Sequence, residues 1–168
     1  MYKIGIIGNG FVGSSVAHGF SSNTGCDVED VKIYDKDNSK STHTLNEVVN
    51  DSDYIFLSVP TPSKSDGSIS LDIVQEVFEE IHNVIDYETD CQPVILLRST
   101  VTPGTTSKIQ GEYPRMNIVF NPEFLTERSA KLDFINQSRI VLGGTWGNTT
   151  KVEQLYQWRF GKHIPVIK

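Results

Sequence analysis

The sequence has 168 residues, a formal net charge of −6, and 38% hydrophobic and 21% charged residues, which are the length and composition of one ordinary globular domain rather than of a disordered chain. No Lys/Arg cluster offers the basic surface of a nucleic-acid binder, and no run of about 18 apolar residues could span a membrane. The two cysteines and four histidines have no zinc-site spacing and cannot form a disulfide framework, so we predict no metal and a reduced, cytoplasmic setting.

Short apolar runs typical of buried strands recur along the chain, and amphipathic stretches separate them. The predicted strands are 3–7, 31–34, 54–59, 93–97, 116–120, 139–142 and 163–168. The predicted helices are 11–20, 44–50, 72–85 with Ser70 as its N-cap, 103–110, 127–134 and 148–160. This alternation predicts an α/β fold, a Rossmann-type, doubly wound, mainly parallel sheet that forms a single domain over residues 1–168.

The first predicted strand is followed directly by the motif Gly8-Asn9-Gly10-Phe11-Val12-Gly13. In a G-x-G-x-x-G motif the first glycine allows a tight turn, the second admits a pyrophosphate close to the backbone, and the third lets the helix pack on the strand. The N-terminus of the helix offers unpaired N–H groups and partial positive charge to phosphates. The motif therefore predicts a dinucleotide site.

An acidic residue stands where such a site needs one. Asp35 ends the second predicted strand, about 20 residues after the glycine motif, where a carboxylate accepts hydrogen bonds from the adenosine ribose hydroxyls. The same carboxylate would repel a 2′-phosphate. Asp35 therefore predicts NAD rather than NADP as the cofactor.

Three further segments begin where a predicted parallel strand ends. They are Val59-Pro60-Thr61-Pro62, the run 99–106 that starts Ser99-Thr100, and the run 121–127 that reads Asn121-Pro122-Glu123-Phe124-Leu125-Thr126-Glu127. Ligands of such sheets bind beyond the carboxyl ends of the strands. We therefore expect all three segments to meet the glycine motif in one crevice.

Together, these motifs resemble the N-terminal domain of the UDP-glucose/GDP-mannose dehydrogenase family, the nucleotide-sugar 6-dehydrogenases. The resemblance covers residues 3–144 and includes the run Arg139-Ile140-Val141-Leu142-Gly143-Gly144. It implies an enzyme that oxidises the C6 alcohol of a UDP- or GDP-sugar to a carboxylate, using two NAD in two hydride transfers.

The resemblance also implies a role for individual residues. It places the dinucleotide on residues 8–13, Asp35, Lys40, Val59 to Pro62, Ser99 and Thr100, with Glu127 near the nicotinamide. Thr100 and Glu123 would position or activate the water of the hydrolytic step, which makes Thr100, Glu123 and Glu127 the expected catalytic residues. Glu123, Phe124 and Leu125 would face the sugar nucleotide.

The sequence departs from the family pattern at several points. Neither Cys26 nor Cys91 lies in the Gly-rich context of the family's nucleophilic cysteine, so the covalent step has no candidate residue and we expect the chain to be incomplete for turnover. Arg128 replaces the usual glycine, and the connection from Asp35 to Val59 is shorter than usual.

Two alternatives stay open at this stage. One is a stand-alone NAD-binding or assembly module without catalysis, and the other is a fragment of a small hydroxyacid dehydrogenase, which the 121–127 segment fits poorly. The predicted last strand, 163–168, is an exposed sheet edge that could pair with a second chain, so the sequence also leaves an oligomer open.

Overall fold

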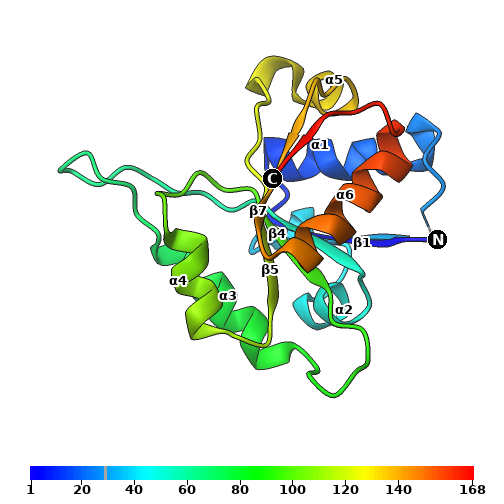
Figure 1. Cartoon of the computed structure of the whole chain (residues 1–168). Helices are drawn as coiled ribbons and strands as arrows, with labels where there is room; N and C mark the ends of the chain where they lie inside the picture. Colours follow the sequence, from blue (N-terminus) through cyan, green and yellow to red (C-terminus); the bar gives the residue numbers. More distant parts are fainter. Residues whose placement is uncertain (29) are drawn as a thin grey trace.

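The computed structural model describes residues 1–28 and 30–168. In chain order the elements are β1 (Lys3–Ile7), α1 (Phe11–Gly19), β2 (Asp30–Tyr34), α2 (Leu45–Asn50), β3 (Tyr54–Leu57), α3 (Asp72–Val84), β4 (Val94–Leu97), α4 (Thr105–Glu112), β5 (Asn117–Phe120), α5 (Ala130–Ile135), β6 (Ile140–Val141), β7 (Gly143–Gly144), α6 (Trp146–Phe160) and β8 (Val166–Ile167) (Figure 1). Short 3₁₀ turns cover Ser22–Thr24, Asn38–Lys40 and Glu127–Ser129.

The strands β1 to β5 form a parallel sheet, and β7 adds an antiparallel edge. The spatial order is β2-β1-β3-β4-β5-β7. The chain leaves β1 toward β2 on one side and continues from β3 on the other, so the order reverses at β1, where doubly wound sheets bind their ligands. The predicted fold class is thereby confirmed.

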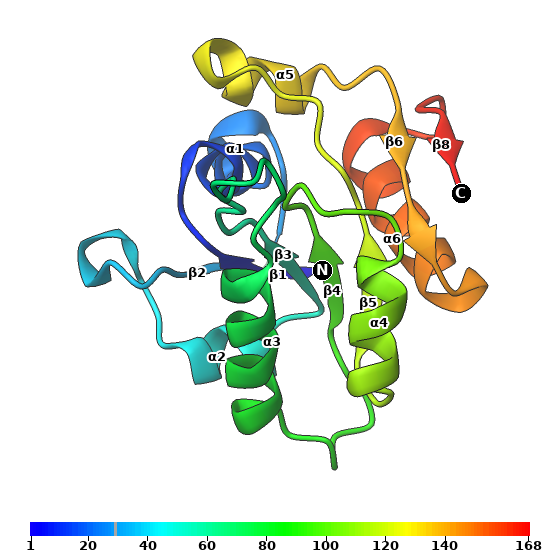
Figure 2. The same ribbon diagram turned by 90° about the vertical axis from the view of Figure 1, so that its left-hand side faces the viewer.

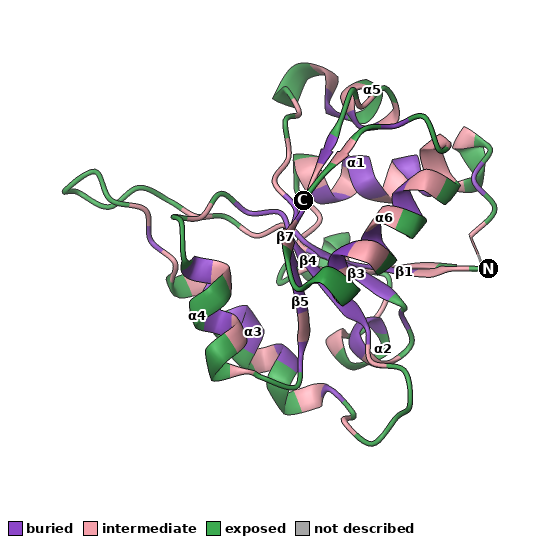
Figure 3. Ribbon diagram, in the orientation of Figure 1, coloured by how far each residue is buried: buried purple, intermediate pink, exposed green. Residues whose placement is uncertain are grey.

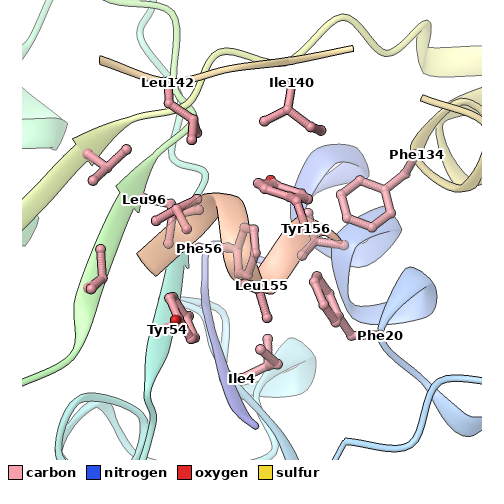
Figure 4. Close-up of a cluster of buried hydrophobic side chains, with 14 of the residues drawn as sticks. Ile4, Phe20, Tyr54, Phe56, Leu96, Phe134, Ile140, Leu142, Leu155 and Tyr156 are labelled. Carbon is pink, nitrogen blue, oxygen red and sulfur yellow. The ribbon is translucent and has the colours of Figure 1, made fainter. Parts of the chain in front are cut away.

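Helices cover both faces of this sheet (Figures 1 and 2). α1, α5 and α6 enclose one buried cluster, and α2, α3 and α4 enclose the other. The central strands β3 and β4 are buried at every position (Figure 3), because helices exclude water from both faces. Figure 4 shows the first cluster, in which Phe56 of β3 contacts Tyr156 of α6 and Phe20, the residue after α1, and Phe20 in turn contacts Phe134 of α5.

Two predictions about the last strands are wrong. Ile140–Val141 does not join the main sheet but pairs in parallel with Val166–Ile167 in a separate two-stranded sheet. Ile140 and Leu142 are buried in the same cluster as α6 (Figure 4), and this packing holds the 140–142 segment over that helix. The 163–168 segment is therefore not an edge of the main sheet; the outer strands of that sheet are β2 and β7.

The start of α3 also differs from the prediction. Leu71, not Ser70, occupies the N-cap position, and the helix begins at Asp72. The Ser70 hydroxyl still accepts the Asp72 N–H, at 3.4 Å. Val74, Val77, Phe78 and Ile81 are buried on one side of the helix, as the helical spacing predicts.

Candidate functional site

A cavity of about 560 Å³, called the crevice below, opens at the carboxyl ends of β1 to β4. Twelve of the residues singled out in the sequence line it: Gly8, Gly10, Phe11, Val12, Asp35, Lys40, Val59, Pro60, Thr61, Ser99, Thr100 and Glu123. The expected meeting of the glycine motif with the strand-end segments is thus present in the structure.

The glycine motif forms a turn that is closed on one side and open on the other. Gly8 has φ +89°, a conformation that side chains rarely adopt, and a Cβ there would collide with the Ser58 carbonyl oxygen. A Cβ on Gly13 would collide with the Gly8 carbonyl oxygen. In contrast, a Cβ on Gly10 would have no atom of the described chain within 4 Å. Gly10 therefore faces free space at the crevice.

The helix that follows presents free backbone donors to that space. α1 begins at Phe11 with Gly10 as its N-cap, and the described chain supplies no side-chain cap and no acidic residue in the first turn. The first backbone hydrogen bond of the helix is the one from the Ser14 N–H to the Gly10 carbonyl, at 2.9 Å. The preceding N–H groups have no intrahelical acceptor, so this end of α1 can bind an anion.

Asp35 lies against the glycine motif, because β2 pairs with β1 and places Tyr34 opposite Ile7. The Asn9 N–H donates to Asp35 Oδ2 at 2.6 Å, and the Asp37 N–H donates to Oδ1 at 2.9 Å. Each oxygen of the carboxylate keeps a further lone pair. Asp35 is therefore held in one orientation and can still accept hydrogen bonds from a diol.

Asn9 acts as a clamp between two loops. Its side-chain amide donates to the Lys40 carbonyl at 2.8 Å, and the residue itself does not line the crevice. Lys40 does line it, as does Lys36, which the sequence analysis did not single out. The Lys36 ammonium lies 3.0 Å from a Glu76 carboxylate oxygen, and this hydrogen bond raises the pKa of Lys36.

The other side of the crevice is formed by the ends of β3, β4 and β5. The Ser99 hydroxyl accepts the Val59 N–H at 3.0 Å and donates to the Val59 carbonyl at 2.7 Å, which ties the end of β4 to the end of β3. Thr100 is exposed and lines the crevice. Glu123 also lines it, and its Oε2 accepts the Leu125 N–H at 2.7 Å.

A buried arginine beneath this end of the crevice was missed by the sequence analysis. Arg98 is 2% exposed, and its Nη1 donates to Asn121 Oδ1 at 2.8 Å and to the Tyr156 hydroxyl at 3.1 Å. The Tyr156 hydroxyl donates to Asn121 Oδ1 at 2.5 Å, and burial raises the pKa of Tyr156. The only sequence signal is a cation directly after the fully apolar strand Val94–Leu97.

The remaining predicted residues lie outside the crevice. Gly13 packs under the loop. Pro62 directly precedes Ser63, which forms an isolated bridge with Ile69, and the segment between β3 and α3 projects from the body (Figure 1). Glu127 is exposed on its 3₁₀ turn.

Phe124 and Leu125 line a second, separate hollow of about 250 Å³. Phe124 is 56% exposed, and the Arg139 guanidinium lies 4.6 Å from the centre of its ring. This hollow lies between the 121–127 segment and α5.

Within residues 1–28 and 30–168, no group of three or more His, Cys, Asp or Glu side chains is placed to hold a metal ion. The helices of the described chain are all too short or too polar to cross a membrane.

The sequence matches the family model for the NAD binding domain of the UDP-glucose/GDP-mannose dehydrogenase family over residues 31–159. The chain belongs to this family. The match begins after the glycine motif, so it rests on the strand-end segments that carried the resemblance. The predicted cofactor, NAD, is confirmed by the family assignment.

Individual relatives agree with this assignment. The chain is 31% identical to the uncharacterized protein MJ1054 of Methanocaldococcus jannaschii, over 98% of this chain and 22% of that protein. It is 30% identical to the UDP-glucose 6-dehydrogenase AglM of Haloferax volcanii, over 84% of this chain and 40% of that protein. The chain thus spans less than half the length of these relatives.

Solved structures show the same fold. A GDP-mannose dehydrogenase from Pseudomonas aeruginosa superposes with a TM-score of 0.77 and 26% identity, over 98% of this chain and 45% of that one. A UDP-glucose dehydrogenase from Pyrobaculum islandicum superposes with a TM-score of 0.81 and 25% identity, over 99% of this chain and 46% of that one.

Proposed function

We propose that residues 1–168 form the NAD-binding domain of a nucleotide-sugar 6-dehydrogenase, which oxidises the C6 alcohol of a UDP- or GDP-sugar. The observation that carries the proposal is the position of the Asp35 carboxylate, which the Asn9 N–H holds at 2.6 Å beside the open space at Gly10. A diol acceptor and an anion-binding helix end thus adjoin each other, as the ribose and pyrophosphate of a dinucleotide require.

The proposed order of the ligand across the crevice follows the order of the strands. Asp35 follows β2, the glycine motif follows β1, and Ser99 and Thr100 follow β4, in a sheet ordered β2-β1-β3-β4. We place the adenosine ribose at Asp35, the pyrophosphate at the start of α1, and the nicotinamide toward Ser99 and Thr100. Lys40 and Val59 to Thr61 line the path between them.

Bound NAD supplies the hydride acceptor for the oxidation. Thr100 and Glu123 line the crevice, on the side where we place the nicotinamide. We assign to them the orientation of the water that hydrolyses the covalent intermediate formed at the oxidised C6. Glu127 lies outside the crevice, so its proposed role near the nicotinamide requires its turn to approach the ligand. Phe124 and Leu125 line the second hollow, which is the proposed sugar side. We further propose a cytoplasmic enzyme that serves polysaccharide biosynthesis.

The positions of the two cysteines favour a second candidate, an NAD-binding module without turnover of its own. Cys26 is buried and precedes β2, and Cys91 is exposed and precedes β4. Both therefore lie toward the amino ends of the parallel strands, whereas the crevice lies at the carboxyl ends. Neither thiol is placed to attack a sugar bound beside Thr100 and Glu123.

Two measurements on the 168-residue chain test these proposals. Calorimetric titration should show NAD binding, and the absence of binding to the folded chain would refute the site. A steady-state assay of NADH formation with UDP-glucose and GDP-mannose should show no sustained turnover, because no thiol reaches the crevice and members of a catalytic unit act together. Sustained turnover that Glu123→Gln abolishes would contradict the second candidate and show that another residue or another copy completes the site.

A further inference from the structure

One wall of the crevice is formed by α3, which contains none of the sequence motifs described above. Ile73, Val77 and Glu80 of α3 all line it, and their spacing places them on one stripe of the helix. Val77 is buried, and Ile73 and Glu80 are half-buried. This stripe faces Tyr34, the last residue of β2, and Lys36, which comes two residues later; both line the same crevice. The wall is therefore apolar apart from one carboxylate.

That carboxylate carries an oxygen without a partner. Within the described chain, Glu80 Oε2 is buried from solvent and accepts no hydrogen bond. Buried polar atoms are nearly always paired, and an ionised carboxylate can only accept. The nearby cation, Lys36, is 3.0 Å from Glu76, one turn earlier on the helix. The geometry thus leaves an acceptor in the crevice wall that a ligand donor can satisfy.

The position of Asp35 indicates which donor this is. This step rests on the proposed function, in which Asp35 binds the adenosine ribose. The base is one glycosidic bond from that ribose, and the apolar lining of the crevice includes Tyr34, which directly precedes Asp35, and Ile73 and Val77 of α3, surfaces that suit the flat faces of a purine. The exocyclic donor of adenine is its 6-amino group.

We propose that Glu80 is a specificity-determining residue that accepts a hydrogen bond from the 6-amino group of the adenine. The site then selects 6-aminopurine dinucleotides over 6-oxopurine dinucleotides. A 6-oxo group places a second acceptor against the carboxylate, so the hydrogen bond at position 6 is lost and the two oxygens repel each other.

The test compares NAD with nicotinamide hypoxanthine dinucleotide, which differs in the base and carries the same charge. The variants are Glu80→Gln and, as a matched control, Glu76→Gln, which removes the exposed negative charge paired with Lys36. A glutamine at position 80 can accept from a 6-amino group or donate to a 6-oxo group. General effects of lost charge cancel in the ratio of the two dissociation constants.

We expect the unmodified chain to bind NAD at least about tenfold more tightly than the hypoxanthine dinucleotide, as one hydrogen bond to a charged group implies. Glu80→Gln should bring the ratio to within about threefold of unity, since glutamine pairs with either base. Glu76→Gln should keep the original ratio. Thermal unfolding of each variant confirms that it is folded.

Several outcomes would overturn the inference. Equal affinity of the unmodified chain for both dinucleotides would show that no residue reads position 6 of the purine. A Glu80→Gln variant that keeps the full preference for NAD would assign the discrimination to another residue. Failure of both dinucleotides to bind would instead refute the proposed function on which the inference rests.

Discussion

Gly10 is the position at which an added side chain should separate cofactor binding from folding. Its backbone has φ −77° and ψ −162°, a conformation open to any residue, and no atom of the described chain lies within 4 Å of a Cβ built there. The Cβ of a valine at position 10 therefore introduces neither strain nor a collision. Its methyl groups enter the space at the start of α1 where we place the pyrophosphate.

The expected magnitudes follow from this geometry. The free energy of unfolding should change by no more than about 1 kcal/mol, since the site is open and the unfolded chain loses some entropy. The melting temperature should then move by less than about 4 °C. Displacing the phosphates from two N–H donors loses about 1.5–3 kcal/mol each, so NAD affinity should fall by about 100-fold or more.

Calorimetry with NAD and a thermal melt measure the two effects separately. Gly111→Val is the matched control, because Gly111 is exposed on α4 and its Cβ would likewise meet no described atom within 4 Å; it should change neither quantity. Gly13→Ala should instead lower the melting temperature, because its Cβ would collide with the Gly8 carbonyl oxygen. A folded Gly10→Val chain with unchanged NAD affinity would refute the placement of the phosphates.

Three further predictions concern single side chains. Asp35→Ala should weaken NAD binding by about 1.5–3 kcal/mol and NADP binding less, as titration with both dinucleotides would show; a variant with unchanged preference would contradict the role of Asp35. Tyr156→Phe should cost about 1–3 kcal/mol of stability at neutral pH in denaturant unfolding, because Arg98 loses a buried hydrogen bond. Above about pH 10 the Tyr156→Phe variant should lose less stability than the unmodified chain. Tyr156 has a raised pKa in the folded chain, so in the unmodified chain the unfolded residue ionises while the folded one keeps its proton, and this difference favours unfolding. Equal losses of stability at alkaline pH in the two proteins would argue against this. Hydrogen bonds from Thr126 lower the pKa of Asp133 in the folded chain. The ionised Asp133 therefore stabilises the fold above about pH 4, and this stabilisation is lost as the pH falls through the lower pKa of the folded state. Asp133→Asn should make the stability depend less on pH on the acid side, and an unchanged acid dependence would count against this role.

The central sheet could be predicted from sequence because its strands are covered on both faces. A strand such as Val94–Leu97 is buried at every position and therefore reads as an unbroken apolar run. The glycine motif could also be recognised from sequence, because a Cβ at Gly8 would collide with its surroundings and the turn therefore requires a glycine there.

The terminal strands could not be predicted in the same way. The strands β6 and β8 have two residues each, which is too short for any period to show. The alternation of Ile140 and Leu142 correctly indicates an extended segment with one buried side. Its partner is set by distant contacts, such as the Leu142 N–H donating to the Ile167 carbonyl at 2.8 Å, and no local pattern encodes that choice.

The candidate site was predictable only where it follows from topology. The carboxyl-end rule correctly gathers Asp35, Thr100 and Glu123 at one crevice. It says nothing about Glu80, because a charged residue beside an apolar helical stripe is usually solvated, whereas Glu80 is half-buried in the crevice wall. Most of the apolar stripe of α3 packs on the sheet, and part of it lines the crevice. The spacing of apolar residues along the helix does not show which residues do which.

Arg98 shows why the site depends on parts of the chain that no binding motif includes. Its guanidinium holds Asn121, at the start of the 121–127 segment, and Tyr156, on α6, and the Asn121 amide donates to the Val141 carbonyl at 3.0 Å. The position of Glu123 at the crevice therefore rests on a buried network that extends to α6. Since a buried charge is stabilised only when it is hydrogen-bonded, these segments must assemble together, and the side of the crevice where we place the nicotinamide is complete only when α6 has packed.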